Sequence, residues 1–357
     1  MLAGAISPHH LTKGSTGRRK APGRRSRVSL VAAPVNPNVQ QLRVEIYQEV
    51  LVPEKFVPVE GRSLWSHSVG SDERDAILLV SGANASALMW PDEFVELLVS
   101  KGYRVIRYDH RDTGRSTFIG FDDAPYTVED LASDAVLILD AWEVDKAHVV
   151  GLSIGATLGQ VLTLDHSDRL HSLTLMCGAA LDVDFVGNIG RAFSGESSPD
   201  GLPLPNKEVL EALSARATPS ESMEEELDRR VKEWGLLSGE KLEFDAADFR
   251  LREQRCIDHA GTWVQPGNHA MATPVPLSRG RELSKVSVPT LVIQGSEDPL
   301  NPPPHGKHIA DLLPNGRLVE IDGLGHCLPK ALLPQIANEI VNHAEQSHAA
   351  DARASRG

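Results

Sequence analysis

Short apolar runs alternate with amphipathic stretches along most of the chain. The apolar runs lie at 76–80, 103–108, 147–150, 172–176, 290–294 and 317–321. Between them, apolar positions recur at helical spacing in 91–101, 127–142, 154–165, 304–313 and 330–344. Such runs are typical of strands buried in a parallel sheet, and the intervening pattern is typical of helices that cover it. With a leading hairpin over 56–69, the pattern predicts an α/β fold with a mostly parallel eight-stranded sheet and helices on both faces.

The alternation stops between 178 and 285. Helical, charged patterns occupy 207–215, 221–236 and 245–259, and strand signals are few. An insertion at the carboxyl ends of parallel strands lies over the crevice where ligands bind. We therefore expect one domain over 46–345, with a helical cap insertion at about 178–285. Residues 346–357 are expected to form a flexible C-terminal tail.

The first 45 residues differ from the rest in composition. They are rich in Ser, Pro, Gly and Arg without periodicity, which predicts a disordered basic N-terminal segment over 1–45. An acid-free, Arg- and Ser-rich N-terminus is also typical of an organelle transit peptide. We expect a cytoplasmic protein or, alternatively, one imported into an organelle through this segment. Removal of residues 1–45 and the oligomeric state are both left open by the sequence.

Charge is distributed unevenly. Residues 1–44 hold eight of the 36 Lys and Arg residues and no acid, so the remainder carries 28 basic residues against 49 acidic ones. A body this acidic repels nucleic-acid phosphates. No apolar run approaches the roughly 20 residues that a membrane-spanning helix needs. We expect a small-molecule partner, with neither nucleic-acid binding nor a membrane span.

Neither a cofactor nor a metal site is predicted. The three cysteines, Cys177, Cys256 and Cys327, are odd in number and widely spaced without a C-x-x-C pair, which argues against disulfides and zinc and favours a reducing compartment. Cys177 is expected to be a small buried hydrophobe, and Cys327 is a candidate for a pocket wall. His305 and His308 share a predicted helix, but no third ligand is near them in sequence.

A strand-to-helix turn carries the candidate nucleophile. Residues 151–155 read Gly-Leu-Ser-Ile-Gly, a G-x-S-x-G pattern between an apolar run and a helical pattern. The turn forces Ser153 into a strained backbone conformation, which is tolerable because both flanking glycines lack a Cβ. The hydroxyl is then raised above the sheet at a helix N-terminus, where backbone N–H groups can face a developing oxyanion.

Two later loops supply the partners that a serine nucleophile needs. Asp298 follows the apolar run 290–294, although the neighbouring Glu297 is an alternative acid. His326 follows the run 317–321 through a Gly-rich turn. Both side chains are expected at the carboxyl edge of the sheet, where Ser153 also emerges. The chain order serine, acid, histidine is the one that a nucleophile elbow of this kind requires.

An oxyanion hole needs two backbone donors. The amide of Ile154, directly after the nucleophile, is the first. The second is expected in the loop after the run 76–80, and we assign it to Ala83. Trp90 could wall the pocket or pack in the core. The charged segment 107–116 could line the site or bind an anion, but a structural turn is the favoured interpretation.

These residues resemble those of α/β-hydrolases, and within that superfamily the chain is similar to the aclacinomycin methylesterase-type serine esterases. The resemblance covers roughly 56–344 and includes the segments 84–94, 106–117, 148–157, 257–261, 288–294 and 305–308. It implies the α/β-hydrolase fold, with Ser153, Asp298 and His326 as nucleophile, acid and base, and Ala83 and Ile154 as oxyanion donors. The chain departs from the pattern at Ile154, where the family has Met, at Cys327, and most of all over 194–240.

The sequence therefore predicts a cofactor-free serine esterase that hydrolyses a carboxylic ester, such as a polyketide methyl ester, through an acyl-enzyme. The same triad also suits a C–C bond hydrolase or a cofactor-free perhydrolase. A non-catalytic receptor on a hydrolase fold is a further alternative, which the intact triad disfavours.

Overall fold

The computed structural model describes residues 53–218, 220–265 and 267–354. The N-terminal segment predicted to be disordered lies outside these ranges. Within them, no helix has the combination of length and apolar character that crossing a bilayer requires.

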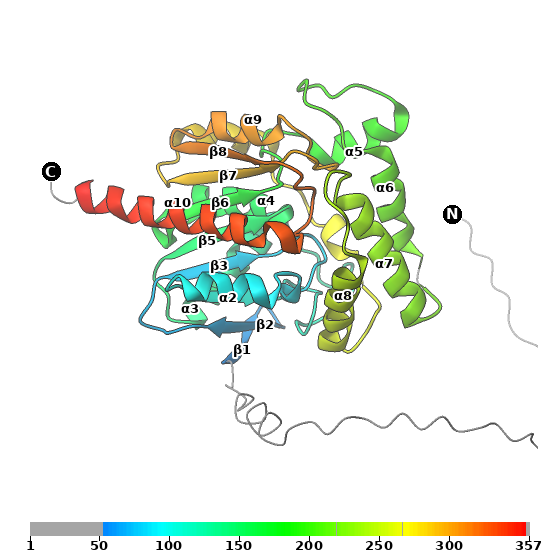
Figure 1. Cartoon of the computed structure of the whole chain (residues 1–357), viewed down its shortest axis with the longest axis horizontal. Helices are drawn as coiled ribbons and strands as arrows, with labels where there is room; N and C mark the ends of the chain where they lie inside the picture. The colour runs from blue at the N-terminus through cyan, green and yellow to red at the C-terminus, as the bar shows by residue number, and fades with distance from the viewer. Residues whose placement is uncertain (1–52, 219, 266, 355–357) are drawn as a thin grey trace, which may run out of the picture. The chain divides into compact units, whose positions relative to one another are not determined.

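Eight strands form one sheet in the order β1-β2-β4-β3-β5-β6-β7-β8 (Figure 1). The strands are β1 (Glu54–Val59), β2 (Arg62–Val69), β3 (Ala76–Val80), β4 (Arg104–Tyr108), β5 (Ala147–Leu152), β6 (Leu170–Met176), β7 (Thr290–Gly295) and β8 (Gly316–Ile321). The two pairings of β2, with β1 and with β4, are antiparallel, and all the others are parallel. The predicted fold class, including the leading hairpin, is confirmed.

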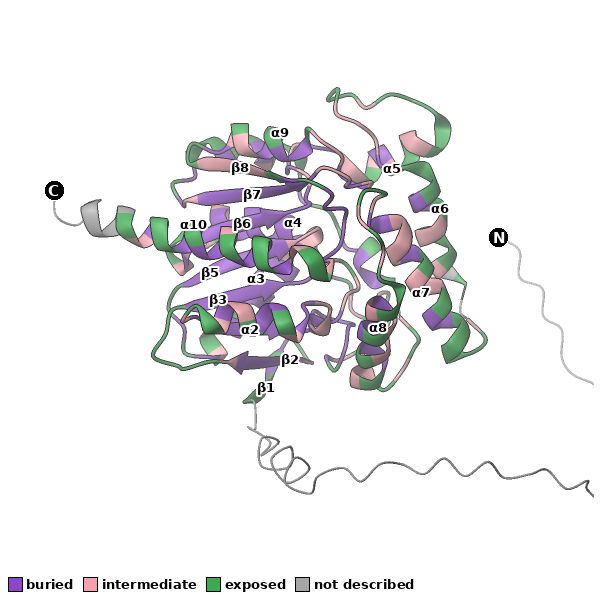
Figure 2. Cartoon of the chain, viewed as in Figure 1, coloured by how far each residue is buried: buried purple, intermediate pink, exposed green. Residues whose placement is uncertain are grey.

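Helices cover both faces of this sheet. They are α2 (Asp92–Ser100), α3 (Val128–Ala141), α4 (Ile154–Asp165), α9 (His305–Leu312) and α10 (Leu333–Ala354). Phe94 of α2 and Ile336 of α10 pack in one apolar cluster, whereas Leu131 of α3 and Leu158 of α4 pack in the other. Figure 2 shows the central strands buried between these two layers. The strands are buried on both faces, which explains their continuous apolar runs.

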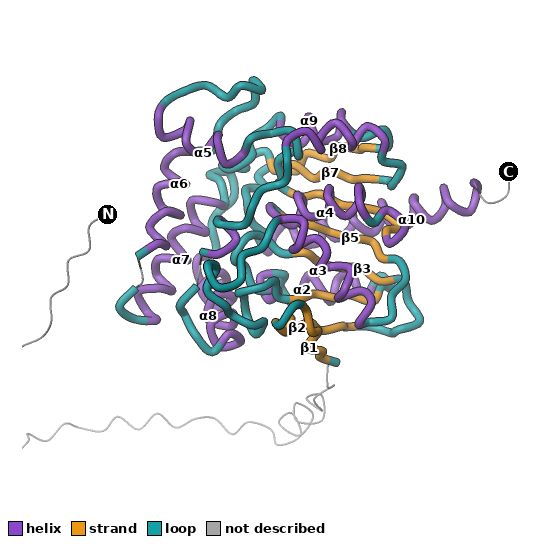
Figure 3. Tube along the Cα trace, turned by 180° about the vertical axis from the view of Figure 1, so that it is seen from behind, coloured by secondary structure: helices purple, strands orange, loops and turns teal. Residues whose placement is uncertain are grey.

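Four further helices lie between β6 and β7, and we call residues 178–285 the cap. They are α5 (Phe185–Ser194), α6 (Lys207–Ser214), α7 (Met223–Leu237) and α8 (Ala246–Ala260). Each begins directly after a side chain that accepts a backbone hydrogen bond, which satisfies one of the free N–H groups of the first turn. These residues are Asp184, Asn206, Ser222 and Asp245. The cap helices lie together at one end of the sheet, as Figures 1 and 3 show from opposite sides.

Short 3₁₀ turns complete the described chain. They are η1 (Ala87–Met89), η2 (Ser167–Arg169), η3 (Ala215–Ala217), η4 (Asn268–Ala270), η5 (Leu277–Lys285) and η6 (Lys330–Leu332). One prediction is corrected at the C-terminus, because residues 346–354 continue α10 instead of forming a flexible tail. The alanines at 349, 350, 352 and 354 are strong helix formers, so the helix continues beyond the predicted end of the domain at 345.

Candidate active site

Ser153 lies in the sharp turn between β5 and α4. Its backbone has φ of 59°, a left-handed value that is strained for a residue with a Cβ. A Cβ on Gly151 would overlap the carbonyl group of Gly155, and a Cβ on Gly155 would overlap the carbonyl oxygen of Val80. Both glycines are therefore needed for the turn to close against β3, as the G-x-S-x-G pattern predicts.

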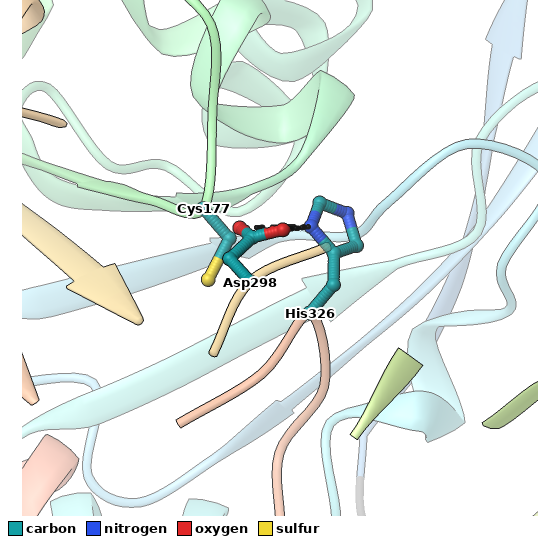
Figure 4. A group of neighbouring side chains, drawn as sticks. All are labelled: Cys177, Asp298 and His326. Atoms are coloured by element: carbon teal, nitrogen blue, oxygen red, sulfur yellow. Dashed lines mark hydrogen bonds and ion pairs between the residues drawn. The ribbon is translucent and has the colours of Figure 1, made fainter. Parts of the chain in front are cut away.

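Asp298 and His326 form a buried pair on the loops after β7 and β8. The Nδ1 atom of His326 lies 3.0 and 3.1 Å from the two carboxylate oxygens of Asp298 (Figure 4). One of these oxygens also accepts from the backbone N–H groups of Leu300 and Asn301 at 2.9 and 3.0 Å. With an ionised Asp298, Nδ1 of His326 carries the proton and Nε2 is left with a free lone pair. The ring is thus set in the tautomer that a general base needs.

The environment of Asp298 favours its ionised form. Burial raises the pKa of this carboxyl, but the facing His326 and the N–H groups of Asn301 and Leu300 lower it more, so that the pKa lies below its ordinary value. The carboxylate remains charged at neutral pH and can stabilise an imidazolium on His326.

One cavity of about 310 Å³ is lined by three of the five predicted site residues, whereas Asp298 and Ile154 do not line it. Ser153, His326 and Ala83 all line it, and Asp298 lies behind His326, buried. Most of the wall is apolar and comes from both the sheet domain and the cap: Met89, Trp90, Phe118, Leu152, Leu300 and Leu328 from the former, and Leu213, Trp234, Leu237, Phe249 and Val264 from the latter. The described structure therefore offers a mostly apolar, partly open chamber over the serine.

The loop after β3 lies against Ser153. A Cβ built on Gly82 would be 3.5 Å from Cβ of Ser153, in ordinary contact. Within the described chain, the amide N–H groups of Ala83 and Ile154 make no hydrogen bond, so both remain available to a ligand. The loop is fixed from the cap, because the N–H of Asn84 donates to Nδ1 of His269 at 2.9 Å. This arrangement suits an oxyanion hole.

The cap adds a charged network to the cavity wall, which sequence reasoning missed. Arg230 of α7 lines the cavity and donates to Glu226 at 2.7 Å and to Glu253 of α8 at 2.9 Å. The indole N–H of Trp234 donates to the other oxygen of Glu253 at 2.6 Å. The one sequence feature that could have indicated this network is the four-residue spacing of Glu226 and Arg230, which places their side chains on the same face of a helix. The network joins α7 to α8 and gives the chamber a polar side.

The charged segment 107–116 is a structural turn that also lines the cavity, through Asp112, Thr113 and Gly114. Asp109 is fully buried and accepts from the hydroxyl of Ser86 at 3.0 Å and from the N–H of Ala87 at 2.8 Å. Arg111 makes a two-pronged contact with the buried Asp134 at 2.6 and 2.7 Å. The preferred interpretation from the sequence therefore holds for these side chains.

Both interpretations of Trp90, as a pocket wall and as a core residue, hold. It lines the cavity and also packs against Phe94.

The three cysteines are free and buried. Burial raises the pKa of the Cys177 thiol well above its ordinary value, so this residue is a small neutral hydrophobe, as predicted. Cys327 and Cys256 both line the cavity. Cys327 thus stands in the pocket wall, one of the positions where the sequence departs from the family pattern.

Among the described residues, Cys177, Asp298 and His326 place ligand atoms within 4.8 Å of one another (Figure 4). Asp298 is already bonded to His326 and to two backbone N–H groups, and the neutral thiol of Cys177 is a poor metal ligand. His308 contacts Asp182 at 2.9 Å, and His305 contacts the carbonyl oxygen of Pro203 at 2.9 Å. These groups therefore favour proton transfer at His326 and not metal binding.

Comparison with known proteins decides the family. The profile of the alpha/beta hydrolase fold family matches residues 75–329. The chain belongs to the α/β-hydrolase family. It is 47% identical over 292 residues to rhodomycin D methylesterase DnrP of Streptomyces peucetius, an alignment that covers 82% of this chain and 98% of that protein. Rhodomycin D methylesterase DauP of Streptomyces sp. strain C5 is 46% identical with the same coverage.

Solved structures agree with this assignment. A hydrolase from Pseudomonas aeruginosa PA01 superposes with a TM-score of 0.59 at 26% identity and covers 83% of this chain and 99% of that one. The resemblance to α/β-hydrolases and to methylesterases within them is thereby confirmed. This α/β-hydrolase is a carboxylic ester hydrolase, with relatives that it matches along nearly their full length.

Proposed function

We propose that this hydrolase cleaves a carboxylic methyl ester with Ser153 as nucleophile, His326 as general base and Asp298 as its partner. The observation that carries the proposal is the placement of Ser153 and His326 on one cavity, with Asp298 bonded to Nδ1 of His326. A serine hydroxyl is a weak nucleophile until a neighbouring base accepts its proton.

The reaction proceeds in two acyl-transfer steps. Oγ of Ser153 attacks the ester carbonyl carbon as Nε2 of His326 takes the hydroxyl proton. The tetrahedral intermediate collapses, the bond to the alkoxy oxygen breaks, and His326 returns the proton to release methanol. Water then attacks the acyl-enzyme with the same base, which releases the carboxylic acid and restores the serine. Throughout, Asp298 keeps the imidazole oriented and stabilises its cationic form.

The amides of Ala83 and Ile154 are proposed to bind the oxyanion of each tetrahedral intermediate. Support comes from their lack of hydrogen bonds within the described chain and from the contact distance between Gly82 and Ser153. The N-terminus of α4 adds a favourable dipole at the same place. A preorganised donor of this kind typically contributes about 10²- to 10³-fold in kcat.

The proposed substrate is a methyl ester on a polycyclic polyketide such as rhodomycin D. The relatives that bear the name rhodomycin D methylesterase match this chain over 98% of their length. The apolar chamber under the cap suits a large, flat, hydrophobic acyl group, and Arg230, Arg252 and Glu253 give it polar contacts at one side.

The three free cysteines support the proposal that the protein works in a reducing compartment such as the cytoplasm.

A fluorophosphonate probe followed by peptide mass mapping tests the assignment of the nucleophile. We expect one adduct on Ser153, and its loss when rhodomycin D is present in excess. Ser81 provides the matched control, because it lines the same cavity but has no base beside it in the proposed mechanism. Labelling of Ser81→Ala should equal that of the parent, whereas an adduct on any other serine would contradict the proposal.

A further inference from the structure

Two buried histidines lie behind the loop that carries the candidate oxyanion donor Ala83. His110 lies two residues after β4, and His269 lies in η4 of the cap. Both are buried, and their rings meet edge to face with centres 5.5 Å apart. Neither ring is among the described residues that line the cavity, although residues 81–86 of the loop are. The two rings are therefore placed to act on the loop and not on a substrate.

The first ring holds the start of this loop. Nε2 of His110 lies 3.1 Å from the carbonyl oxygen of Ser81. A carbonyl oxygen only accepts, so this nitrogen carries a proton and donates it. Burial, followed by the nearby His269, lowers the pKa of His110 to about 3, so the ring is neutral at physiological pH and has no proton on Nδ1. The contact to Ser81 thus fixes one tautomer.

The second ring holds the far end of the loop. The backbone N–H of Asn84 donates to Nδ1 of His269 at 2.9 Å, and Nε2 of His269 donates to the carbonyl oxygen of Arg111 at 2.9 Å. Burial lowers the pKa of this ring, which favours its neutral form. Only the neutral tautomer with its proton on Nε2 makes both bonds, since a proton on Nδ1 would face the N–H of Asn84.

The segment between these two contacts is a tight turn. Asn84 has φ of 57°, a left-handed value that asparagine adopts more readily than most residues do. The N–H of Ala85 donates to the carbonyl oxygen of Gly82 at 3.2 Å, which closes the turn around Ala83. The side-chain amide of Gln265 also donates to the carbonyl oxygen of Asn84. The N–H of Ala83 therefore lies between two points that other parts of the chain fix.

We propose that His110 and His269 are positioning residues that direct the N–H of Ala83 toward the oxyanion. This inference rests on the proposed function, because it gives the two rings a purpose in the same reaction. A reacting group displaced by about 1 Å can cost about 100-fold in rate, so correct placement of the loop has a measurable effect. Since His269 belongs to the cap, the cap sets the geometry of the oxyanion hole as well as the shape of the chamber.

Asparagine and glutamine substitutions test each ring, because each amide retains one of the two nitrogen positions. The polar atoms of asparagine correspond to Nδ1 of histidine, and those of glutamine correspond to Nε2. The loop is held through Nδ1 at position 269, so His269→Asn should behave as the parent does and His269→Gln should not. It is held through Nε2 at position 110, so His110→Gln should behave as the parent does and His110→Asn should not. A role in packing alone predicts no such reversal.

The first readout is the rate at which a fluorophosphonate labels Ser153, because the phosphonyl oxygen accepts from the same donors as the oxyanion. His269→Gln and His110→Asn should each slow labelling by about 10- to 100-fold. The second readout is hydrogen exchange of the Asn84 amide. His269→Gln should speed this exchange by about 2- to 10-fold, the effect of losing one ordinary hydrogen bond, and His269→Asn should not.

Circular dichroism checks that each variant is folded, and if one pair fails to fold, the pair at the other position decides. The proposal is overturned if the two folded variants at a position label Ser153 at equal rates, or if Asn84 exchanges equally in His269→Gln and His269→Asn. Turnover of rhodomycin D by the parent is measured in parallel. Its absence, with normal labelling of Ser153, would contradict the proposed substrate and leave the comparison of the variants unaffected.

Discussion

His326 is held from two sides. Its ring faces Asp298 at 3.0 Å, and its backbone N–H donates to the carbonyl oxygen of Leu237 at 2.6 Å. Leu237 is the last residue of α7, so the cap is bonded directly to the loop that carries the proposed general base. Preorganisation of this kind fixes the direction of a catalytic group before substrate enters. The position of the cap therefore bears on the geometry of catalysis as well as on substrate choice.

At the residue scale, Asp298→Asn should lower kcat by about 10⁴-fold, because an amide no longer selects the tautomer with a proton on Nδ1 or stabilises the imidazolium. KM should change little, since the side chain does not line the cavity. Steady-state kinetics on a methyl ester measure both constants. Glu297→Gln is the matched control for the alternative acid and should keep near-parent kcat. A loss confined to Glu297→Gln would reverse the assignment.

At the element scale, the turn between β5 and α4 depends on backbone contact. Gly155 faces Val80, the last residue of β3, and Ser81 of the following loop so closely that any side chain meets their carbonyl groups. The same contact brings the candidate oxyanion donors next to Ser153. The elbow is therefore a packing feature of two strands and a helix, and the serine takes its strained backbone conformation from it.

Gly155→Ala should lower the free energy of unfolding by about 1–3 kcal/mol or more, as overpacking in a close contact does. Urea unfolding followed by circular dichroism measures it. Gly190→Ala in α5 is the control, because a Cβ there has no atom within 4 Å. It should stabilise the protein slightly, by about 0.5–1 kcal/mol. Equal effects of the two substitutions would show that the contact at Gly155 is unimportant.

The buried network in the cap gives a second prediction at this scale. Arg230→Met leaves the buried carboxylates of Glu226 and Glu253 without their shared partner, which should cost about 3–5 kcal/mol of stability. Differential scanning calorimetry should show a lower Tm. Arg229→Met, one residue away with a more exposed guanidinium, should change the Tm far less. A parent-like Tm for Arg230→Met would mean that the network does not hold α7 to α8.

At the scale of the whole molecule, buried neutral histidines set the dependence of stability on pH. Burial, aided by neighbouring cationic or imidazole groups, lowers the pKa values of His67, His110 and His148 to about 3 each. Below the unfolded value of about 6.5, the unfolded chain binds protons that the native chain does not. The free energy of unfolding should therefore fall as pH decreases from 6.5 toward 3, by up to about 1.4 kcal/mol per pH unit for each ring.

Urea unfolding at pH 7, 6 and 5 measures this slope. His67→Gln retains an acceptor for Arg107 but does not titrate, so its slope should be smaller than that of the parent by up to about 1.4 kcal/mol per unit. Stability that stays constant or increases between pH 7 and 5 would rule out neutral buried rings.

Much of this molecule could be predicted from local sequence, and the contacts that could not be predicted share a cause. Alternating apolar runs predict the sheet, and Ser153, Asp298 and His326 each follow a strand closely, so the topology alone brings them to one edge. The contacts of Arg230 with Glu253, and of His148 with His348, join residues distant in sequence and depend on how helices pack. The hydrophobic periodicity of the sequence does not reveal such packing. The end of α10 differs from the prediction for the opposite reason, since a local feature, the helix-forming alanines at 349, 350, 352 and 354, extends the helix.

The central claim is that Ser153 is the nucleophile for hydrolysis of a polyketide methyl ester. Its most direct test is the rate of methanol and acid release from rhodomycin D by the parent and by Ser153→Ala, with folding of both checked by circular dichroism. We predict multiple turnovers for the parent and a loss of about 10⁵- to 10⁶-fold in kcat for the variant. A folded Ser153→Ala protein that retains kcat within about tenfold of the parent would contradict the account.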